Sequence, residues 1–169
     1  MGCFCLGSFF FARFHRYLGQ RKRWVMVLSF VIQLIMIVVA GIMITVGPDT
    51  GPAGPVNVWI AIPIALIAFQ SAGQAVTSRV LSYSGLTSVV LTSIYCDLFS
   101  DATLFTAPLA ENPERNRRAT APVMVCIGAL FGGLWAHSEW GLAGAVWTAV
   151  VLKSFAILAW FLWKSEKEE

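Results

Sequence analysis

Charged side chains are scarce in this chain: only 12% of its 169 residues are Asp, Glu, Lys or Arg, whereas 57% are hydrophobic. A soluble domain carries about twice that share of charge, and it could not hide this much apolar surface from water. The formal net charge of +3 is small and scattered, so it gives no indication of nucleic-acid binding. The composition therefore predicts an all-α integral membrane protein whose partner is the lipid bilayer.

Signatures of enzymes and metal sites are also missing. The sequence has no P-loop, no GxSxG turn and no HExxH motif. Its two histidines, His15 and His137, are too few for a multi-histidine metal site, and its four cysteines have no metal-ligand spacing. We therefore expect no enzymatic activity, no cofactor and no metal ion.

Long apolar runs are what the sequence does have. A transmembrane helix needs roughly 20 apolar residues to cross a core of ~30 Å, and residues 24–46, 56–76, 119–136 and 142–163 meet this requirement. With their flanks, the second span extends to residue 81 and the third to residue 137. We expect residues 1–18 to contain a truncated helix and the start of the basic loop. The apolar part, residues 2–12, resembles the last half of a helix whose beginning is missing. We expect a polytopic transmembrane helix bundle of four full spans plus this truncated helix.

A fifth apolar segment, residues 85–105, is too short to cross the membrane. Its uncharged part, residues 85–96, is about 18 Å long as a helix. We interpret it as a half-span or re-entrant helix, which membrane proteins tolerate where it is buried in protein or lines a cavity. A polar stripe along it consists of Ser88, Thr92, Tyr95 and Cys96, with Asp97 just beyond.

Basic residues predict the orientation of the bundle. If residues 85–105 do not cross, every basic group falls in the loops at 19–23 and 106–118, the tail at 164–169, or at the adjoining helix ends. The connections on the opposite side, residues 47–55 and 137–141, contain no Lys or Arg. We therefore expect the basic loops and the C-terminus to be cytoplasmic. The residues concerned are Arg13, Arg16, Arg21, Lys22, Arg23, Arg79, Arg115, Arg117, Arg118, Lys164 and Lys167.

Lys153 lies near the middle of the fourth span, where a charge costs roughly 2.5–3.5 kcal/mol on insertion scales. Such a residue indicates a functional site, and Asp97 is its natural partner because buried charges are usually matched. The pair could be a salt bridge that only holds helices together. It could also be a proton or solute relay on an interrupted helix.

Polar and small side chains follow opposite faces of the second span. Four alanines recur at helical spacing on one face: Ala61, Ala65, Ala68 and Ala72. Near the basic end of the other face lie Gln70, Gln74, Ser78 and Arg79. Glutamines in lipid must face protein or water, which leaves interhelical hydrogen bonding and the lining of a polar cavity as alternatives. In the third span, Gly128 and Gly132 form a GxxxG helix-packing motif.

Several segments resemble a known family of membrane proteins. The runs AFQSAGQAVTSRVL, GLTSVVLTSIYCDLFSD and ENPERNRRATAPVMVCIGALFGG resemble the second half of YoaK-like proteins, a domain of unknown function. The runs LKSFAILAWFLWK and FFFARFHRYLGQRKRW resemble the C-terminal helix and the basic middle loop of its fungal branch. The resemblance implies an N-terminally truncated member that has lost its first half. It implies no substrate and no catalytic residues.

Two functions fit these observations. The first is a small-solute or ion carrier whose polar site combines residues of the second span, the half-span and the last span: Gln70, Gln74, Ser78, Arg79, Thr92, Tyr95, Asp97 and Lys153. The second is a non-transporting membrane scaffold in which the same groups only join helices. In either case we expect the chain to pair with a second copy of itself or with the missing N-terminal half.

Overall fold

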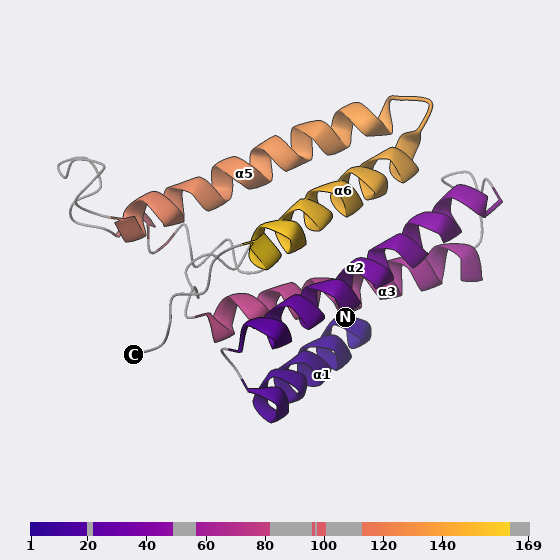
Figure 1. Ribbon diagram of the computed structural model, residues 1–169. Helices are drawn as coiled ribbons and strands as arrows, with labels where there is room; N and C mark the ends of the chain where they lie inside the picture. The colour runs from indigo at the N-terminus through magenta and orange to yellow at the C-terminus, as the bar shows by residue number, and fades with distance from the viewer. Residues whose placement is uncertain (20–21, 49–56, 82–95, 97, 101–112, 163–169) are drawn as a thin grey trace.

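The computed structural model of the protein describes residues 1–19, 22–48, 57–81, 96, 98–100 and 113–162. These residues form five α-helices and, within the described ranges, no β-strand. The helices are α1 (Gly2–Leu18), α2 (Arg23–Val46), α3 (Val58–Val80), α5 (Pro113–Ala136) and α6 (Gly141–Leu162) (Figure 1). The predicted half-span at residues 85–105 lies almost wholly outside the described residues, and it stays a prediction.

Four of the described helices are long and apolar enough to cross a membrane. They are α2, α3, the Asn116–Ala136 part of α5, and α6. Lipid offers no hydrogen bonds to the backbone, so apolar segments of this length satisfy their own amide and carbonyl groups as helices. The predicted all-α membrane bundle with four spans is confirmed, and α1, with 17 residues, is not among the spans.

The helix boundaries follow local sequence signals. Asn57 caps α3, because its side-chain oxygen accepts a hydrogen bond from the Val58 amide at 2.6 Å. Gly19 ends α1 with a positive φ of 102°, a conformation that glycine adopts without steric cost. α5 begins at Pro113, before the predicted residue 119. Proline suits the first position of a helix, and the arginines that follow are good helix formers, so this polar turn extends the span.

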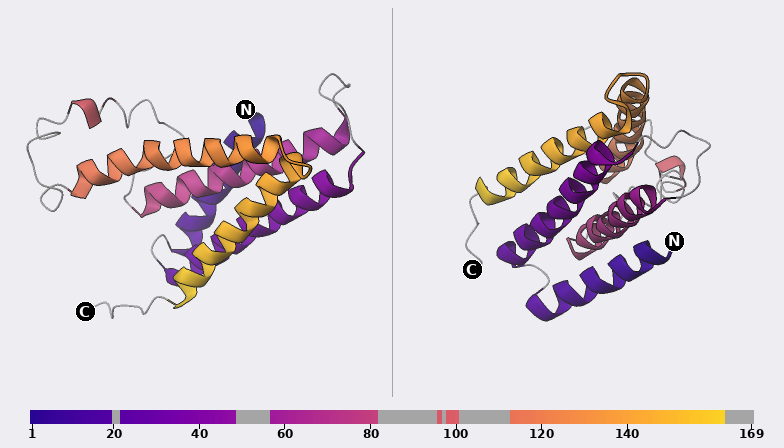
Figure 2. Two further views of the ribbon diagram at one scale, coloured as in Figure 1. Left: turned by 90° about the horizontal axis from the view of Figure 1, so that it is seen from above. Right: turned by 90° about the vertical axis from the view of Figure 1, so that its right-hand side faces the viewer.

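Four helices lie side by side in the order α6, α2, α3, α1, and α5 packs against α6 (Figure 2). α1, α3 and α6 run in one direction, whereas α2 and α5 run in the other (Figure 1). The end of α3 and the beginning of α5 therefore lie at the same end of the molecule. A short turn after Ala136 reverses the chain into α6.

α1 and α3 approach each other closely at two glycines. A Cβ atom on Gly7 would come within 2.6 Å of the Phe69 carbonyl oxygen, and one on Gly73 would come within 2.6 Å of the Phe11 ring. Phe11 is fully buried by this contact. Small residues let two helix backbones approach each other in a membrane. Here each helix has one glycine at the point where the other helix packs against it.

α2 and α6 are joined by polar contacts at both ends. At one end, the Arg23 guanidinium donates hydrogen bonds to the carbonyl oxygens of Trp160, at 2.7 and 3.1 Å, and of Phe161, at 2.7 Å. These carbonyls belong to the last turn of α6, where no further amide of the helix can reach them. At the other end, the Trp147 indole donates to Thr45 Oγ1 at 3.1 Å.

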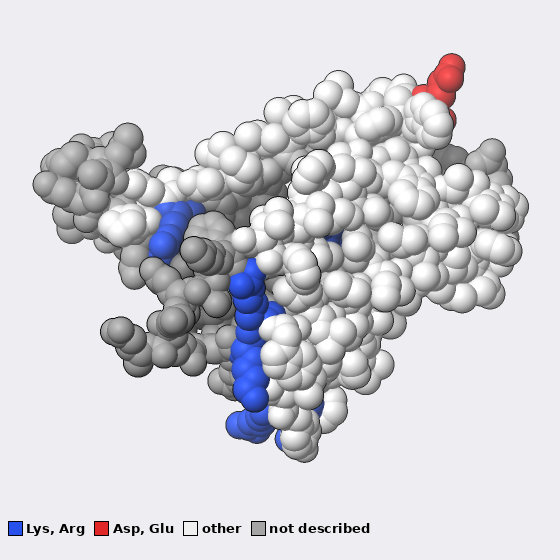
Figure 3. Space-filling model, viewed as in Figure 1, with Lys and Arg blue, Asp and Glu red and all other residues white. Residues whose placement is uncertain are grey.

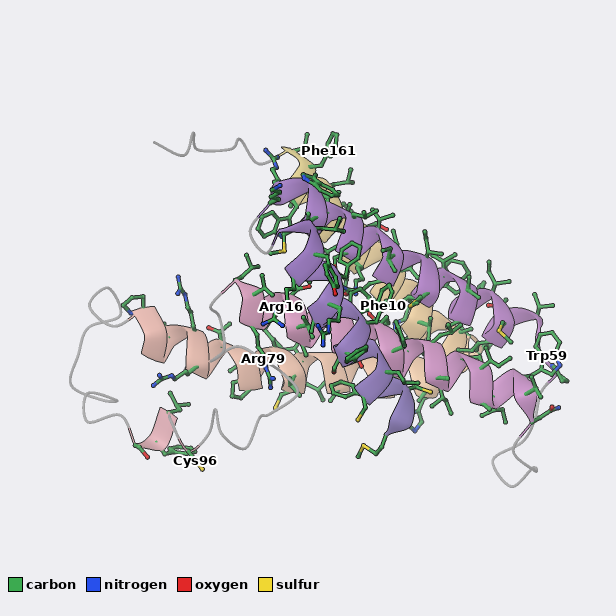
Figure 4. All side chains as sticks on the ribbon, turned by 90° about the horizontal axis from the view of Figure 1, so that it is seen from below. Phe10, Arg16, Trp59, Arg79, Cys96 and Phe161 are labelled. Atoms are coloured by element: carbon green, nitrogen blue, oxygen red, sulfur yellow. The ribbon has the colours of Figure 1, made fainter. Side chains whose placement is uncertain are left out.

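Basic side chains gather at one end of the molecule (Figure 3). In that view the Lys and Arg atoms cluster toward the left, where α1 and α3 end and α2 and α5 begin. Glu139, the one acidic residue whose side chain the structure describes, belongs to the turn between α5 and α6 at the opposite end. Figure 4 shows the same polarity along α3, with Arg79 near one end of the helix and Trp59 near the other.

Candidate functional site

A polar network joins three helices in the apolar interior. From α6, the Lys153 ammonium donates one hydrogen bond to Gln33 Oε1 of α2 and another to Gln70 Oε1 of α3, each 2.8 Å long. The Gln33 amide nitrogen donates in turn to Ser29 Oγ at 3.2 Å. We call these four residues the Lys153 network. An ammonium has only N–H donors, so both glutamines must turn their oxygens toward it.

The Lys153 network lies deep within the spans. Gln33, Gln70 and Lys153 each stand near the middle of their helices. Ser29 and Gln33 are fully buried, Gln70 is 8% exposed, and Lys153 is half-buried. The network is therefore enclosed by the protein on the side of α2 and open to its surroundings at Lys153.

The charge in this network has no opposite charge among the described side chains. Its two partners are neutral amide oxygens, and Glu139 lies at the far end of the molecule. Two amide dipoles stabilise an ammonium in the interior less well than a carboxylate would. One N–H of the ammonium and the amide nitrogen of Gln70 also have no hydrogen-bond partner in the described part of the chain. This arrangement can hold a group that accepts hydrogen bonds.

The structure shows two members of the site that the sequence analysis missed. Ser29 and Gln33 carry no charge, so the hydropathy of residues 24–46 does not single them out. Their spacing of four residues places both on one face of α2, which was the available signal. Gln33 supplies one of the two oxygens that hold Lys153.

Of the predicted site residues, Gln70 and Lys153 lie together in the Lys153 network. Gln74 and Arg79 are exposed, and Ser78 is half-buried. Ser88, Thr92, Tyr95 and Asp97 lie outside the described residues, whereas Cys96 is described and exposed. The pairing of Asp97 with Lys153 stays a prediction, and the described partners of Lys153 are the two glutamines.

The predicted packing residues have different surroundings. Ala72 is buried, and its Cβ lies 3.0 Å from the position that a Cβ atom on Gly7 would take. Ala65 and Ala68 are half-buried, and Ala61 is exposed. A Cβ atom on Gly128 or Gly132 of the GxxxG motif would meet no atom within 4 Å, so in the described structure this face of α5 is open.

A second buried polar contact lies between α1 and α3. His15 is fully buried, and its Nε2 lies 3.4 Å from Thr77 Oγ1. The Thr77 hydroxyl donates to the Gly73 carbonyl at 2.9 Å, so its oxygen accepts from the histidine ring. The other ring nitrogen, Nδ1, is buried and has no hydrogen-bond partner among the described residues. No cluster of three or more His, Cys, Asp or Glu side chains occurs in the described ranges.

Four apolar spans, three of them joined by a half-buried lysine, define an integral, multi-pass helical membrane protein. The chain belongs to the DUF1275 family, described as a protein of unknown function, whose model matches residues 1–159. This confirms the YoaK-like resemblance, while the fungal branch and the missing first half stay predictions. No curated protein and no solved structure shows significant similarity to the chain.

Proposed function

We propose that this protein is a membrane carrier for a small solute, with no enzymatic activity, and that the solute binds at the Lys153 network. The observation that carries the proposal is the Lys153 ammonium, held by one glutamine oxygen from α2 and one from α3. A charged side chain inside a membrane is costly, and such residues commonly mark a solute or ion pathway. The half-buried position of Lys153 leaves this charge within reach of a solute.

The helices around the network support the same role. The Lys153 side chain reaches from α6 past α2 to Gln70 of α3, and it thereby links the two helices on either side of α2. A solute that competes for the ammonium or for Gln70 would change how these helices are joined. Carriers bind their substrates near the membrane midplane between helices that can shift relative to one another.

The proposal is tested by solute uptake into vesicles that contain the full chain. Stopped-flow light scattering would follow the swelling of these vesicles in a panel of small anions, cations and neutral solutes. We expect at least one solute to enter faster than into empty vesicles, and Lys153→Met to reduce its rate to that of empty vesicles. Leu152→Met is the matched control, because this neighbouring side chain is exposed on α6 and should leave uptake unchanged.

Two results would contradict the proposal. One is the absence of protein-dependent uptake for every solute in the panel. The other is equal uptake by Lys153→Met and the unaltered protein at equal abundance in the vesicles. The first result would favour the non-transporting scaffold, to which the close contact of α1 and α3 at Gly7 and Gly73 also gives support. The second would show that the solute does not bind at the Lys153 network.

We also propose that the basic end of the bundle faces the cytoplasm. Positively charged loops stay on the cytoplasmic side of a membrane, and the described Lys and Arg side chains other than Lys153 gather at one end. The test uses single cysteines at Glu139 or Lys22 in a variant without the four native cysteines. In spheroplasts of a bacterial host, an impermeant maleimide should label Glu139→Cys directly and Lys22→Cys only after permeabilisation. The reverse pattern would contradict the orientation.

A further inference from the structure

We propose that the Lys153 network binds a small carboxylate anion with a single negative charge. The proposal rests on the carrier function above and names its substrate class. Hydrogen-bond donors in the network outnumber the acceptors that they reach. Of the three N–H groups of an ammonium, two point to Gln33 and Gln70 and one has no partner among the described residues. The amide nitrogen of Gln70 adds further donors without a partner in that part of the chain.

The single positive charge of the network indicates a ligand with a single negative charge. Lys153 is its one ionisable group, and no described carboxylate lies near it. An anion with one charge would neutralise the ammonium, whereas a cation would be repelled and a neutral solute would leave the charge unmatched. A dianion would bring a second charge into the apolar interior, at a large desolvation cost.

The positions of the donors favour a carboxylate over a single-atom anion. Gln70 Oε1 lies 2.8 Å from the Lys153 ammonium, so the nitrogen of the same amide lies close to that ammonium as well. The two oxygens of one carboxylate can accept from both donors at once, and charge-assisted hydrogen bonds of this kind are the strong ones. Chloride offers no second acceptor atom. The apolar side chains of the surrounding spans suit a short hydrocarbon tail on the ligand.

Equilibrium binding to the purified full chain in detergent micelles tests this inference without requiring transport. The probe is acetate, and its controls are chloride at equal ionic strength and acetamide, the neutral analogue of the same shape. Binding is measured from the rise in the thermal unfolding midpoint and from the NMR line width of isotope-labelled acetate. We expect acetate to raise the unfolding midpoint of the protein and its NMR line to broaden on binding. Chloride and acetamide should not raise the midpoint, and the acetamide line should stay narrow.

Two substitutions separate a binding site from a structural contact. Lys153→Met should weaken acetate binding at least about tenfold, since it removes a charged hydrogen bond. Gln70→Glu should weaken it to a similar extent, because it supplies Lys153 with a carboxylate from within the chain. The thermal midpoint without ligand should not fall in Gln70→Glu. A contact that only joins helices would be strengthened by this change and would bind no acetate in either form.

The inference is overturned if acetate does not raise the unfolding midpoint and its NMR line does not broaden. It is also overturned if acetamide binds as well as acetate, or if Gln70→Glu retains the affinity of the unaltered protein. The carrier proposal fails separately. Acetate binding without any solute uptake would refute transport and leave the anion site in place, whereas Lys153-dependent uptake of neutral solutes alone would support the carrier and refute the carboxylate.

Discussion

Replacing Gly7 by leucine is expected to separate α1 from α3 and to lower the free energy of unfolding by about 3 kcal/mol. The reason is the backbone of the partner helix. A Cβ atom at position 7 would lie 2.6 Å from the Phe69 carbonyl oxygen and 3.1 Å from Phe69 Cα. Backbone atoms cannot move aside as the end of a flexible side chain can, so the two helices must move apart and expose Phe11.

Gly2→Leu is the matched control for this prediction. Gly2 lies in the same helix, and a Cβ atom there would meet nothing within 4 Å. The free energy of unfolding can be measured by titration from mild detergent into denaturing mixed micelles. Equal stabilities of the two variants would show that α1 does not pack against α3 through Gly7.

Replacing Gln33 by leucine is expected to lower the free energy of unfolding by about 3 kcal/mol. The change removes one of the two oxygens that hold the Lys153 ammonium, and a hydrogen bond to a charged group is worth about 1.5–3 kcal/mol. It also leaves the fully buried Ser29 hydroxyl without its donor. The same titration measures the effect.

Gln74→Leu serves as the comparison for Gln33→Leu. Gln74 is exposed, so in a membrane environment its replacement by leucine should leave the stability unchanged or raise it. A loss of stability in Gln74→Leu as large as that in Gln33→Leu would mean that the polarity of the spans matters in general. The hydrogen bond between Gln33 and Lys153 would then make no specific contribution to the stability.

Much of the fold could be predicted from composition, because a bilayer forces long apolar segments to form helices. Each apolar run of sufficient length becomes a helix whatever its neighbours are, so α2, α3, α5 and α6 lie within a few residues of their predicted ranges. The largest difference is the beginning of α5 at Pro113. There the polar residues before the apolar run continue the helix, and hydropathy alone gives no signal for such an extension.

The partners within the site could be predicted only in part. Lys153 stood out because its charge is costly in lipid, and Gln70 because it is polar within a span. Gln33 has the same chemistry, but its role depends on the antiparallel packing of α2 against α6, which brings it opposite Lys153. The rotation and pairing of helices follow from packing between side chains far apart in the chain, and a single sequence does not contain that information explicitly.

Small-residue motifs show the same limit. Gly128 and Gly132 form the recognisable GxxxG, yet both face open space in the described structure. The close helix contact occurs at Gly7 and Gly73, which belong to no such motif. A small residue permits two helices to approach each other, but it does not specify which helix will do so.

A double-mutant cycle between Lys153 and Gln70 tests whether the two side chains are coupled in the Lys153 network. Lys153→Met alone should change the free energy of unfolding little, because the removal of an ion that is costly to bury offsets the loss of its hydrogen bonds to Gln33 and Gln70. Gln70→Leu alone should lower it, because the ammonium then loses an acceptor. In the double mutant this loss should disappear, which corresponds to a coupling energy of about 1–3 kcal/mol. A coupling energy of zero would contradict the Lys153 network.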